Sequence, residues 1–238
     1  NDYTGGLVGS STGVIANCYS AGSVTSYGDY AGGLVGENKL TVKDCYADCG
    51  VAGRDDVGGL VGRNNGTVEA SYSRSSVEGR DAVGGLVGRC TPGEIVNCYA
   101  QGDVTGQWYV GGLVGTNGGR HARRIGAIRK CYSVAAVLGG SQSGGLLGAD
   151  WGGEIRDCFW DIQTSGRTTS YGGTGKTTAE MQMASTFLQA GWDFAGETAN
   201  GAEDLWWIVE GKDYPRLWWE PAGRSGAAAV VENLCPGR

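Results

Sequence analysis

The stretch Gly32-Gly33-Leu34-Val35-Gly36 decides the fold, because the same five residues recur along the chain. Copies of this phrase, the last with leucine in place of valine, begin at Gly5, Gly32, Gly58, Gly84, Gly111 and Gly144. The starts are 27, 26, 26, 27 and 33 residues apart, and an insertion around residues 118–125 explains the long last interval. A repeat this short cannot bury its own apolar face and must stack on its neighbours. The sequence therefore predicts a repeat array.

A second phrase follows the first in each repeat, an apolar residue three positions before Cys-Tyr, as in Ile15-Ala16-Asn17-Cys18-Tyr19. The third copy has Ser71 in place of cysteine, and the last has Phe159 in place of tyrosine. A column of valines stands nine residues after that apolar position: Val24, Val51, Val77, Val104 and Val137. Short runs rich in Val, Ile and Tyr, bounded by Gly and Asn, are typical of strands. No stretch before about Thr177 has an apolar stripe at helical spacing. We expect three short strands per repeat, with glycine-rich corners.

The period selects the architecture. About 26 residues suit one coil of a β-solenoid with strands stacked about 4.8 Å apart, whereas a propeller blade needs roughly 40–50 residues. We predict an all-β fold, a parallel β-helix in which a right-handed coil is favoured. Its expected organisation is a solenoid over residues 1–161, a mixed capping region with one short helix and a tryptophan cluster over 162–220, and a linker and tail over 221–238. The helix is expected over residues 179–190, capped by Thr177 or Thr178.

Two columns of the repeat are interpreted as structural ladders. One contains Asn38, Asn64 and Asn117, two residues after the glycine phrase. Asparagine tolerates left-handed backbone and bonds to neighbouring backbone, so this column predicts a ladder of turns.

The other column holds five of the eight cysteines: Cys18, Cys45, Cys98, Cys131 and Cys158. We expect buried free thiols, with disulfides between adjacent coils as the alternative. Cys49, Cys90 and Cys235 stand off this column. Because the chain has no Cys-x-x-Cys pair, no metal site is expected.

The column beside the cysteines is the candidate ligand-binding surface. It consists of Tyr19, Tyr46, Tyr72, Tyr99 and Tyr132, and Phe159 continues it. Successive strand residues face opposite sides, so a tyrosine next to an inward cysteine points outward. An outward aromatic ladder would offer a flat platform to sugar rings or to another fibre. The alternative is a buried aromatic column that adds only stability.

The Gly-Leu-Val-Gly phrase followed by Cys-Tyr-Ser or Cys-Tyr-Ala resembles the GLUG repeat of large bacterial secreted and surface proteins. The resemblance covers about residues 5–161 in six copies. The segment from Phe159 to Glu220 resembles the region that often closes such arrays. The resemblance implies a β-solenoid at the cell surface or outside the cell, since GLUG repeats are known in adhesins and in some immunoglobulin A proteases. It carries over no catalytic residue, because in those proteases the repeats are not the peptidase.

Composition and motifs limit the classes of partner that the chain is expected to bind. With 25 acidic and 19 basic residues the formal charge is −6, which disfavours nucleic acid. No run of 18 apolar residues is present, so no membrane insertion is expected. Residues 173–178 look like a phosphate-binding loop, but Ser170 stands where its first glycine belongs, so no cofactor is expected. The single histidine, His121, falls in the inserted loop, interpreted as a solvated basic protrusion or a contact for acidic glycans.

The predicted function is therefore non-catalytic: a structural, extracellular or cell-surface β-solenoid serving as adhesion stalk, spacer or head-to-tail filament subunit. Residues 2–4 match those before later phrases, so the chain starts partway through a coil. We expect its uncapped edge either to continue upstream sequence or to self-associate.

Two other functions are weighed against this one. The first is a carbohydrate-binding module that uses the tyrosine ladder, with a glycan or another cell-surface molecule as partner. The weaker one is a polysaccharide-degrading β-helix enzyme that would use the turn acids Asp29, Asp55, Asp56 and Asp81. Because these acids belong to a repeated turn column, solvated turn residues are expected instead.

Overall fold

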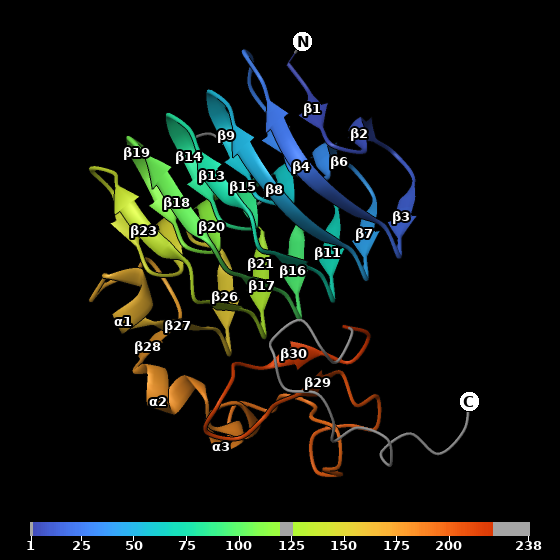
Figure 1. Ribbon diagram of the computed structural model, residues 1–238, viewed down its shortest axis with the longest axis vertical. Helices are drawn as coiled ribbons and strands as arrows, with labels where there is room; N and C mark the ends of the chain where they lie inside the picture. The colour runs from blue at the N-terminus through green and yellow to red at the C-terminus, as the bar shows by residue number, and fades with distance from the viewer. Residues whose placement is uncertain (1, 120–125, 221–238) are drawn as a thin grey trace.

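Figure 1 shows the computed structural model, which describes residues 2–119 and 126–220. Six coils stack along one axis, and every contact between strands of neighbouring coils is parallel. The predicted parallel β-solenoid is confirmed. The inserted residues 120–125, which include His121, and the expected linker and tail at 221–238, which include Cys235, lie outside the described residues.

The first half of each coil supplies two sheets. The first sheet contains β1 (Thr4–Gly5), β5 (Ala31–Gly32), β9 (Asp55–Gly58), β14 (Asp81–Gly84), β19 (Trp108–Gly111) and β24 (Ser143–Gly144). The second sheet contains β2 (Val8–Ser11), β6 (Val35–Asn38), β10 (Val61–Asn64), β15 (Val87–Cys90), β20 (Val114–Asn117) and β25 (Leu147–Asp150). The glycine phrase bends between these two sheets. A coil therefore has at least four strands where the sequence suggested three.

The second half of each coil supplies two more sheets. The third contains β3 (Val14–Ala16), β7 (Thr41–Lys43), β11 (Thr67–Glu69), β16 (Glu94–Val96), β21 (Ala127–Arg129) and β26 (Glu154–Arg156). The fourth contains β4 (Tyr19–Thr25), β8 (Tyr46–Ala52), β12 (Tyr72–Ser73), β13 (Ser76–Glu78), β17 (Tyr99–Ala100), β18 (Asp103–Gly106), β22 (Tyr132–Ser133), β23 (Ala136–Gly139), β27 (Phe159–Asp161) and β28 (Thr174–Lys176). This fourth sheet carries the tyrosine column.

Strict register builds the core. Val61 pairs with Val87, and Val68 pairs with Ile95, so each repeat position forms a column of like residues. The leucine of the phrase is fully buried in the second to sixth coils: Leu34, Leu60, Leu86, Leu113 and Leu146. Fully burying one such side chain contributes about 1.5–3 kcal/mol. Coil-on-coil stacking is therefore what makes each short repeat stable.

The first position of the phrase has room only for glycine, because the neighbouring backbone lies too close for a side chain. A Cβ on Gly58 would overlap the carbonyl oxygen of Val61, and Gly84 meets the carbonyl of Val87 in the same way. The corner brings backbone against backbone there, so any side chain would force the two sheets apart.

The closing region differs from the prediction in its helix. It contains α1 (Ile162–Ser165), α2 (Thr178–Met181), α3 (Ala184–Leu188), β29 (Trp206–Trp207) and β30 (Arg216–Leu217). Thr177 caps α2 in a capping box with Glu180, as the sequence indicated. The single helix expected over 179–190 is wrong, because Met183 is extended and separates α2 from α3. The break lets the carboxylate of Glu210 accept a hydrogen bond from the Ala184 amide at 3.0 Å.

The tryptophan-rich residues pack on the side of the solenoid. Trp192, Trp206 and Leu217 form a second apolar cluster with Tyr99 and Tyr132, and Figure 1 shows β29 and β30 below the middle coils. The end of the last coil is closed separately. Trp160 joins the solenoid core there, and β28 adds a further parallel strand to β27.

Candidate functional site

The tyrosine column forms one continuous stack of rings. Ring centroids are 5.1 Å apart from Tyr19 to Tyr46, 5.0 Å to Tyr72, 4.9 Å to Tyr99 and 5.0 Å to Tyr132. Neighbouring ring planes lie within 6–9° of parallel. In-register pairing, for example Tyr72 opposite both Tyr46 and Tyr99, sets this spacing.

This stacking determines what the ladder can present to a partner. Each ring inside the column turns its faces to the rings above and below, so the ring edges and hydroxyl groups face outward. A flat platform for sugar rings needs free ring faces, and the stacked geometry disfavours it. Tyr19 ends the column, and only its Tyr46 side has a ring contact among the described residues.

Burial divides the ladder into two parts. Tyr19 is 64% exposed and Tyr46 is half-buried, whereas Tyr99 is only 2% exposed. Tyr72 and Tyr132 are buried like Tyr99, because the closing region covers them. The structure therefore brings all five predicted residues into one column but leaves two of them open. Ligand binding by the ladder stays a prediction, and at the three covered rings it would require the closing region to move.

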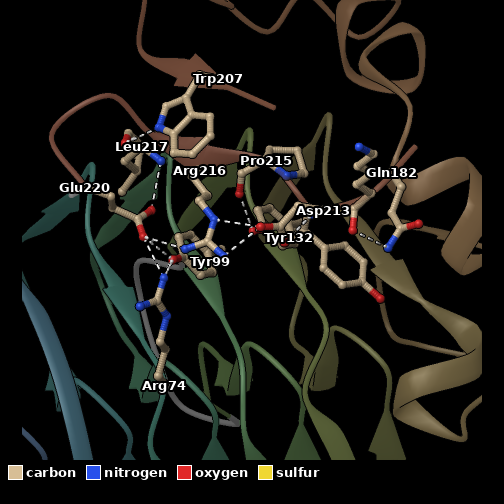
Figure 2. A network of polar contacts seen from close by, with 12 residues as sticks. Arg74, Tyr99, Tyr132, Gln182, Trp207, Asp213, Pro215, Arg216, Leu217 and Glu220 are labelled. Atoms are coloured by element: carbon tan, nitrogen blue, oxygen red, sulfur yellow. Dashed lines mark hydrogen bonds and ion pairs between the residues drawn. The ribbon is translucent and has the colours of Figure 1, made fainter. Parts of the chain in front are cut away.

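An ion pair between the partly buried Arg74 and the buried Glu220 fastens the closing region to the ladder (Figure 2). Arg74 donates from Nη2 to Oε2 of Glu220 at 2.7 Å, and the Tyr99 hydroxyl donates to the same oxygen at 2.8 Å. The other carboxylate oxygen accepts the amide of Leu217 at 2.9 Å. We call Arg74, Tyr99 and Glu220 the clamp. It joins residues 146 positions apart in the sequence.

Burial and neighbouring charges act in opposite directions on the clamp carboxylate. Burial raises the pKa of Glu220, and the Leu217 amide, Arg74 and the Tyr99 hydroxyl oppose that rise. Burial and the nearby Glu220 raise the pKa of Tyr99, so this hydroxyl stays a donor. Arg216 adds a second guanidinium 3.9 Å from Glu220 and pairs with Asp213 at 2.7 Å. Removing one partner of such a buried group leaves the other charge uncompensated.

One of the four turn acids departs from the expectation of solvent exposure. Asp56 is buried and accepts a hydrogen bond from Nε of Arg89 at 2.7 Å, while Asp81 lies 3.6 Å from the same guanidinium. A left-handed backbone at Asp56, with φ of 51°, accompanies this placement. Burial raises the pKa of Asp56 to about 6, against the lowering effect of Arg89. The contacts of Asp56 therefore make it one partner of a structural ion pair with Arg89.

The cysteine column is a set of free thiols. All seven described cysteines are free, and all but the half-buried Cys18 are buried. Cys45 donates from Sγ to the Lys43 carbonyl at 3.1 Å. Burial raises the pKa of Cys45 to about 11 and that of Cys90 to about 12. Thiols of this kind are poor nucleophiles.

The asparagine column bonds from coil to coil. Asn38 donates from Nδ2 to Oδ1 of Asn64 at 2.8 Å, and Asn117 donates to Asp150 at 2.9 Å. Cys90 interrupts the column and takes a 3.7 Å contact from the Asn64 amide. Within residues 2–119 and 126–220, no group of three or more His, Cys, Asp or Glu is placed to hold a metal ion.

The residues that look like a phosphate-binding loop form a strand. Thr174–Lys176 is β28, which pairs in parallel with β27. Lys176 lies 3.6 Å from Glu180, the residue that completes the cap of α2. The ammonium group of Lys176 therefore pairs with a carboxylate of the closing region.

Sequence reasoning missed the clamp and a second anchor at Asp161. The carboxylate of Asp161 accepts hydrogen bonds from the Thr178 and Tyr214 hydroxyls, both at 2.7 Å, and caps α1. The available signal was Arg74 itself. Two residues after each ladder tyrosine the other coils carry Ala21, Asp48, Gln101 and Val134. Arg74 is the one positively charged residue in that column, which indicates that it has a partner the other coils lack.

Three comparisons place the chain among known proteins. The family described as "The GLUG motif" matches residues 1–25 and 79–105. A curated relative from Evansella cellulosilytica, named "Putative Gly-rich membrane protein", is 38% identical over 63 residues, which is 26% of this chain and 6% of the relative. A crystal structure from Bacteroides ovatus, titled as that of "a putative immunoglobulin A1 protease", aligns with a TM-score of 0.58 at 18% identity. That alignment covers 91% of this chain and 75% of the other.

These comparisons support different statements. At 18% identity the Bacteroides ovatus structure shows the fold alone. This chain spans only a small part of its curated relative. Among the described residues, no helix has the length and apolar character to cross a membrane. The recurrent phrases, the family match and the coil-by-coil register agree: the chain contains GLUG motifs at residues 1–25 and 79–105, and its repeats fold as a β-solenoid.

Proposed function

We propose that this chain is a non-catalytic, structural β-solenoid of the cell surface or extracellular space, where it serves as a rigid spacer or adhesion stalk. Six coils in unbroken register carry this proposal. Each coil contacts only its neighbours, so the number of coils sets the length of the body. The continuous column of buried leucines gives that body a single core.

The surroundings of the reactive groups support a non-catalytic role. The buried Asp56 carboxylate is held by Arg89, and the Glu220 carboxylate is held by Arg74 and Tyr99. A general acid or base needs a carboxyl that can reach a substrate proton. Both of these carboxylates instead join parts of the fold.

The GLUG repeats and the membrane protein named among the relatives support a location at or outside the cell surface. The chain's formal charge of −6 is compatible with that setting. Fractionation of the producing cell, followed by detection of this chain, tests the location. Recovery in the cytoplasmic fraction alone would contradict it.

Duplication of one coil tests the spacer role. A variant that repeats residues 33–58 adds one full period at the Gly-Gly junction. We expect it to fold and to lengthen the solenoid by about 4.8 Å in small-angle X-ray scattering. A control that repeats residues 33–51 breaks the period and is expected to lose the fold. Loss of the fold in the in-period variant would contradict a length set by coil number.

The first coil supports a further proposal about partners. Its Leu7 and Tyr19 are exposed, while the same positions are buried in the fourth coil. We propose that this edge accepts another coil of the same period. At the far end, α1 and β28 cover part of the last coil among the described residues, so the two ends do not match.

Electron microscopy tests that choice of partner. In negative stain, with light scattering on the same samples, we expect discrete short rods at every concentration. Filaments with a repeat near one subunit length would instead establish head-to-tail self-association.

The open end of the ladder favours carbohydrate binding as a second candidate function. Tyr19 is exposed and Tyr46 is half-buried, and the Trp219 ring centroid lies 6.3 Å from that of Tyr46. Replacing Tyr19 and Tyr46 together by Ser tests it. Loss of glycan retention with unchanged melting would support binding. Retention equal to that of the parent chain would exclude the ladder as the binding surface.

A further inference from the structure

A hollow of about 480 Å³ lies at the closed end of the solenoid. One wall is the turn of the last coil with Ser141, Gln142 and Ser143, and the other is the segment after α1 with Arg167, Thr169 and Tyr171. Sites for small ligands commonly enclose about 300–1,000 Å³. The hollow is therefore large enough for one or two sugar units.

The hollow exists because a seventh coil begins but stays incomplete. The amide of Gly145 donates to the Thr169 carbonyl at 3.1 Å, and the amide of Tyr171 donates to the Leu147 carbonyl at 3.4 Å. The first sheet gains no such neighbour, since β24 is its last strand among the described residues. The hollow occupies the place that a seventh strand of this sheet would fill.

Gln142 supplies a neutral amide to the lining of the hollow. It stands two residues before its glycine phrase, where Tyr30 and Tyr109 stand in the second and fifth coils. Asp56 and Ala82 hold this position in the third and fourth coils, so Gln142 is the one amide in a variable column.

Arg167 supplies a fixed positive charge. It donates from Nη2 to the carbonyl oxygens of Val137 at 3.1 Å and Gly139 at 2.7 Å, so its guanidinium is held against the edge of β23. Its Nε is buried without a hydrogen-bond partner. Among the described residues it forms no ion pair, and it is the one charged residue that lines the hollow. A pre-organised guanidinium is suited to a carboxylate.

The other side chains that line the hollow are neutral, and among them the Ser170 hydroxyl is held by the amides of Leu146 and Leu147. The side chains of Ser141, Gln142, Ser143 and Thr169 make no hydrogen bond with the described residues. The Tyr171 side chain beside them is 48% exposed. Hydroxyl and amide groups next to an open aromatic ring match the alternating polar and apolar faces of a sugar.

We propose that this hollow binds an acidic saccharide unit. The carboxylate of the sugar pairs with Arg167, its hydroxyl groups bond with Gln142, Ser141 and Thr169, and its apolar face rests on Tyr171. A phosphate would be matched by several cations, whereas one guanidinium among neutral donors fits a single carboxylate on a polyhydroxylated ring. This site is separate from the tyrosine ladder, and its existence does not depend on the spacer role.

Nuclear magnetic resonance titration tests the site. The isotope-labelled chain is titrated with trigalacturonate, and with maltotriose as the neutral counterpart. We expect trigalacturonate to shift the amide signals of residues 140–143 and 167–171 and to bind at least about fivefold more tightly than maltotriose. Absence of these shifts, or equal binding of the neutral sugar, would overturn the proposal.

Matched variants locate the binding. Tyr171→Ala and Gln142→Ala remove side chains that make no hydrogen bond in the fold, and each is expected to weaken binding about fivefold. Tyr27→Ala is the control, since Tyr27 is 97% exposed and belongs to the first coil. Arg167→Gln is expected to abolish the preference for trigalacturonate. Should Arg167→Gln unfold, the first two variants still decide, because unchanged affinity in both would refute the site.

Discussion

The first and fifth coils of this solenoid carry the same repeat but meet different surroundings. In the first coil Leu7 is 51% exposed and Tyr19 protrudes, while in the fifth coil the equivalent Leu113 and Tyr132 are buried. Both coils have strands in the same four sheets. The difference comes from what lies beside them. Repeats build the ladders, and non-repeating sequence closes one end and one side.

The closed end combines several small devices. Trp160 fills the core beyond the last cysteine, β28 extends one sheet, and Arg167 bonds to the edge carbonyls of β23. An open edge of parallel strands invites pairing with another chain. Arg167 occupies two of those carbonyls and so blocks pairing along β23.

The largest expected effect comes from matched changes in the ladder. Tyr99→Ala removes a ring stacked between Tyr72 and Tyr132 and a clamp hydroxyl, and should lower the free energy of unfolding by about 4–5 kcal/mol. Tyr19→Ala, at the open end, should cost less than about 1 kcal/mol. Urea denaturation followed by circular dichroism measures both. Similar losses would show that the two ends are equally covered.

The second-largest loss of stability is expected from a change in the clamp. Glu220→Gln leaves the Arg74 guanidinium without its buried carboxylate and should cost about 3–4 kcal/mol. The loss should fall on the closing region, seen as earlier tryptophan fluorescence change and faster proteolysis there than in the solenoid. Glu203→Gln, at an exposed position of the same region, is the control. Equal stability of the two variants would refute the clamp.

The buried Asp56 in β9 is expected to make the free energy of unfolding depend on pH. Its folded pKa of about 6 lies above the ordinary value of 3.8, so the folded chain binds this proton more tightly than the unfolded chain. The resulting stability is present at low pH and is lost as pH rises from about 4 to 6, up to about 3 kcal/mol in all. Asp56→Asn removes this dependence.

Paired unfolding curves from pH 4 to 8 check the prediction for Asp56. The difference between the parent chain and Asp56→Asn should change below pH 6 and level off above it. Parallel curves across the whole range would show that the carboxyl titrates normally.

The features that could be predicted from the sequence are those that repeat from coil to coil or follow from a local motif. The leucine and cysteine columns, the tyrosine ladder and the cap at Thr177 follow from periodicity or from a local motif, since each residue's partner is its own copy or a near neighbour. Features that depend on one long-range partner could not be read in this way. Arg74 meets Glu220 only because the closing region folds back along the side of the coils.

Local geometry explains the remaining differences. The glycine phrase bends because two backbones approach closely at Gly58, which splits the expected strand in two. The expected helix divides at Met183, where Glu210 from a distant loop caps the second part. Asp56 belongs to a turn column by sequence, yet its left-handed backbone accompanies burial under Arg89.

Hydrogen exchange of the backbone amides, resolved coil by coil with mass spectrometry, tests the central claim most directly. If the closing region protects the coils that it covers, exchange should be fastest in the first coil and slowest in the third to fifth coils, under the closing region. Equal protection in the first and fourth coils, or exchange that begins at the closing region, would contradict this account.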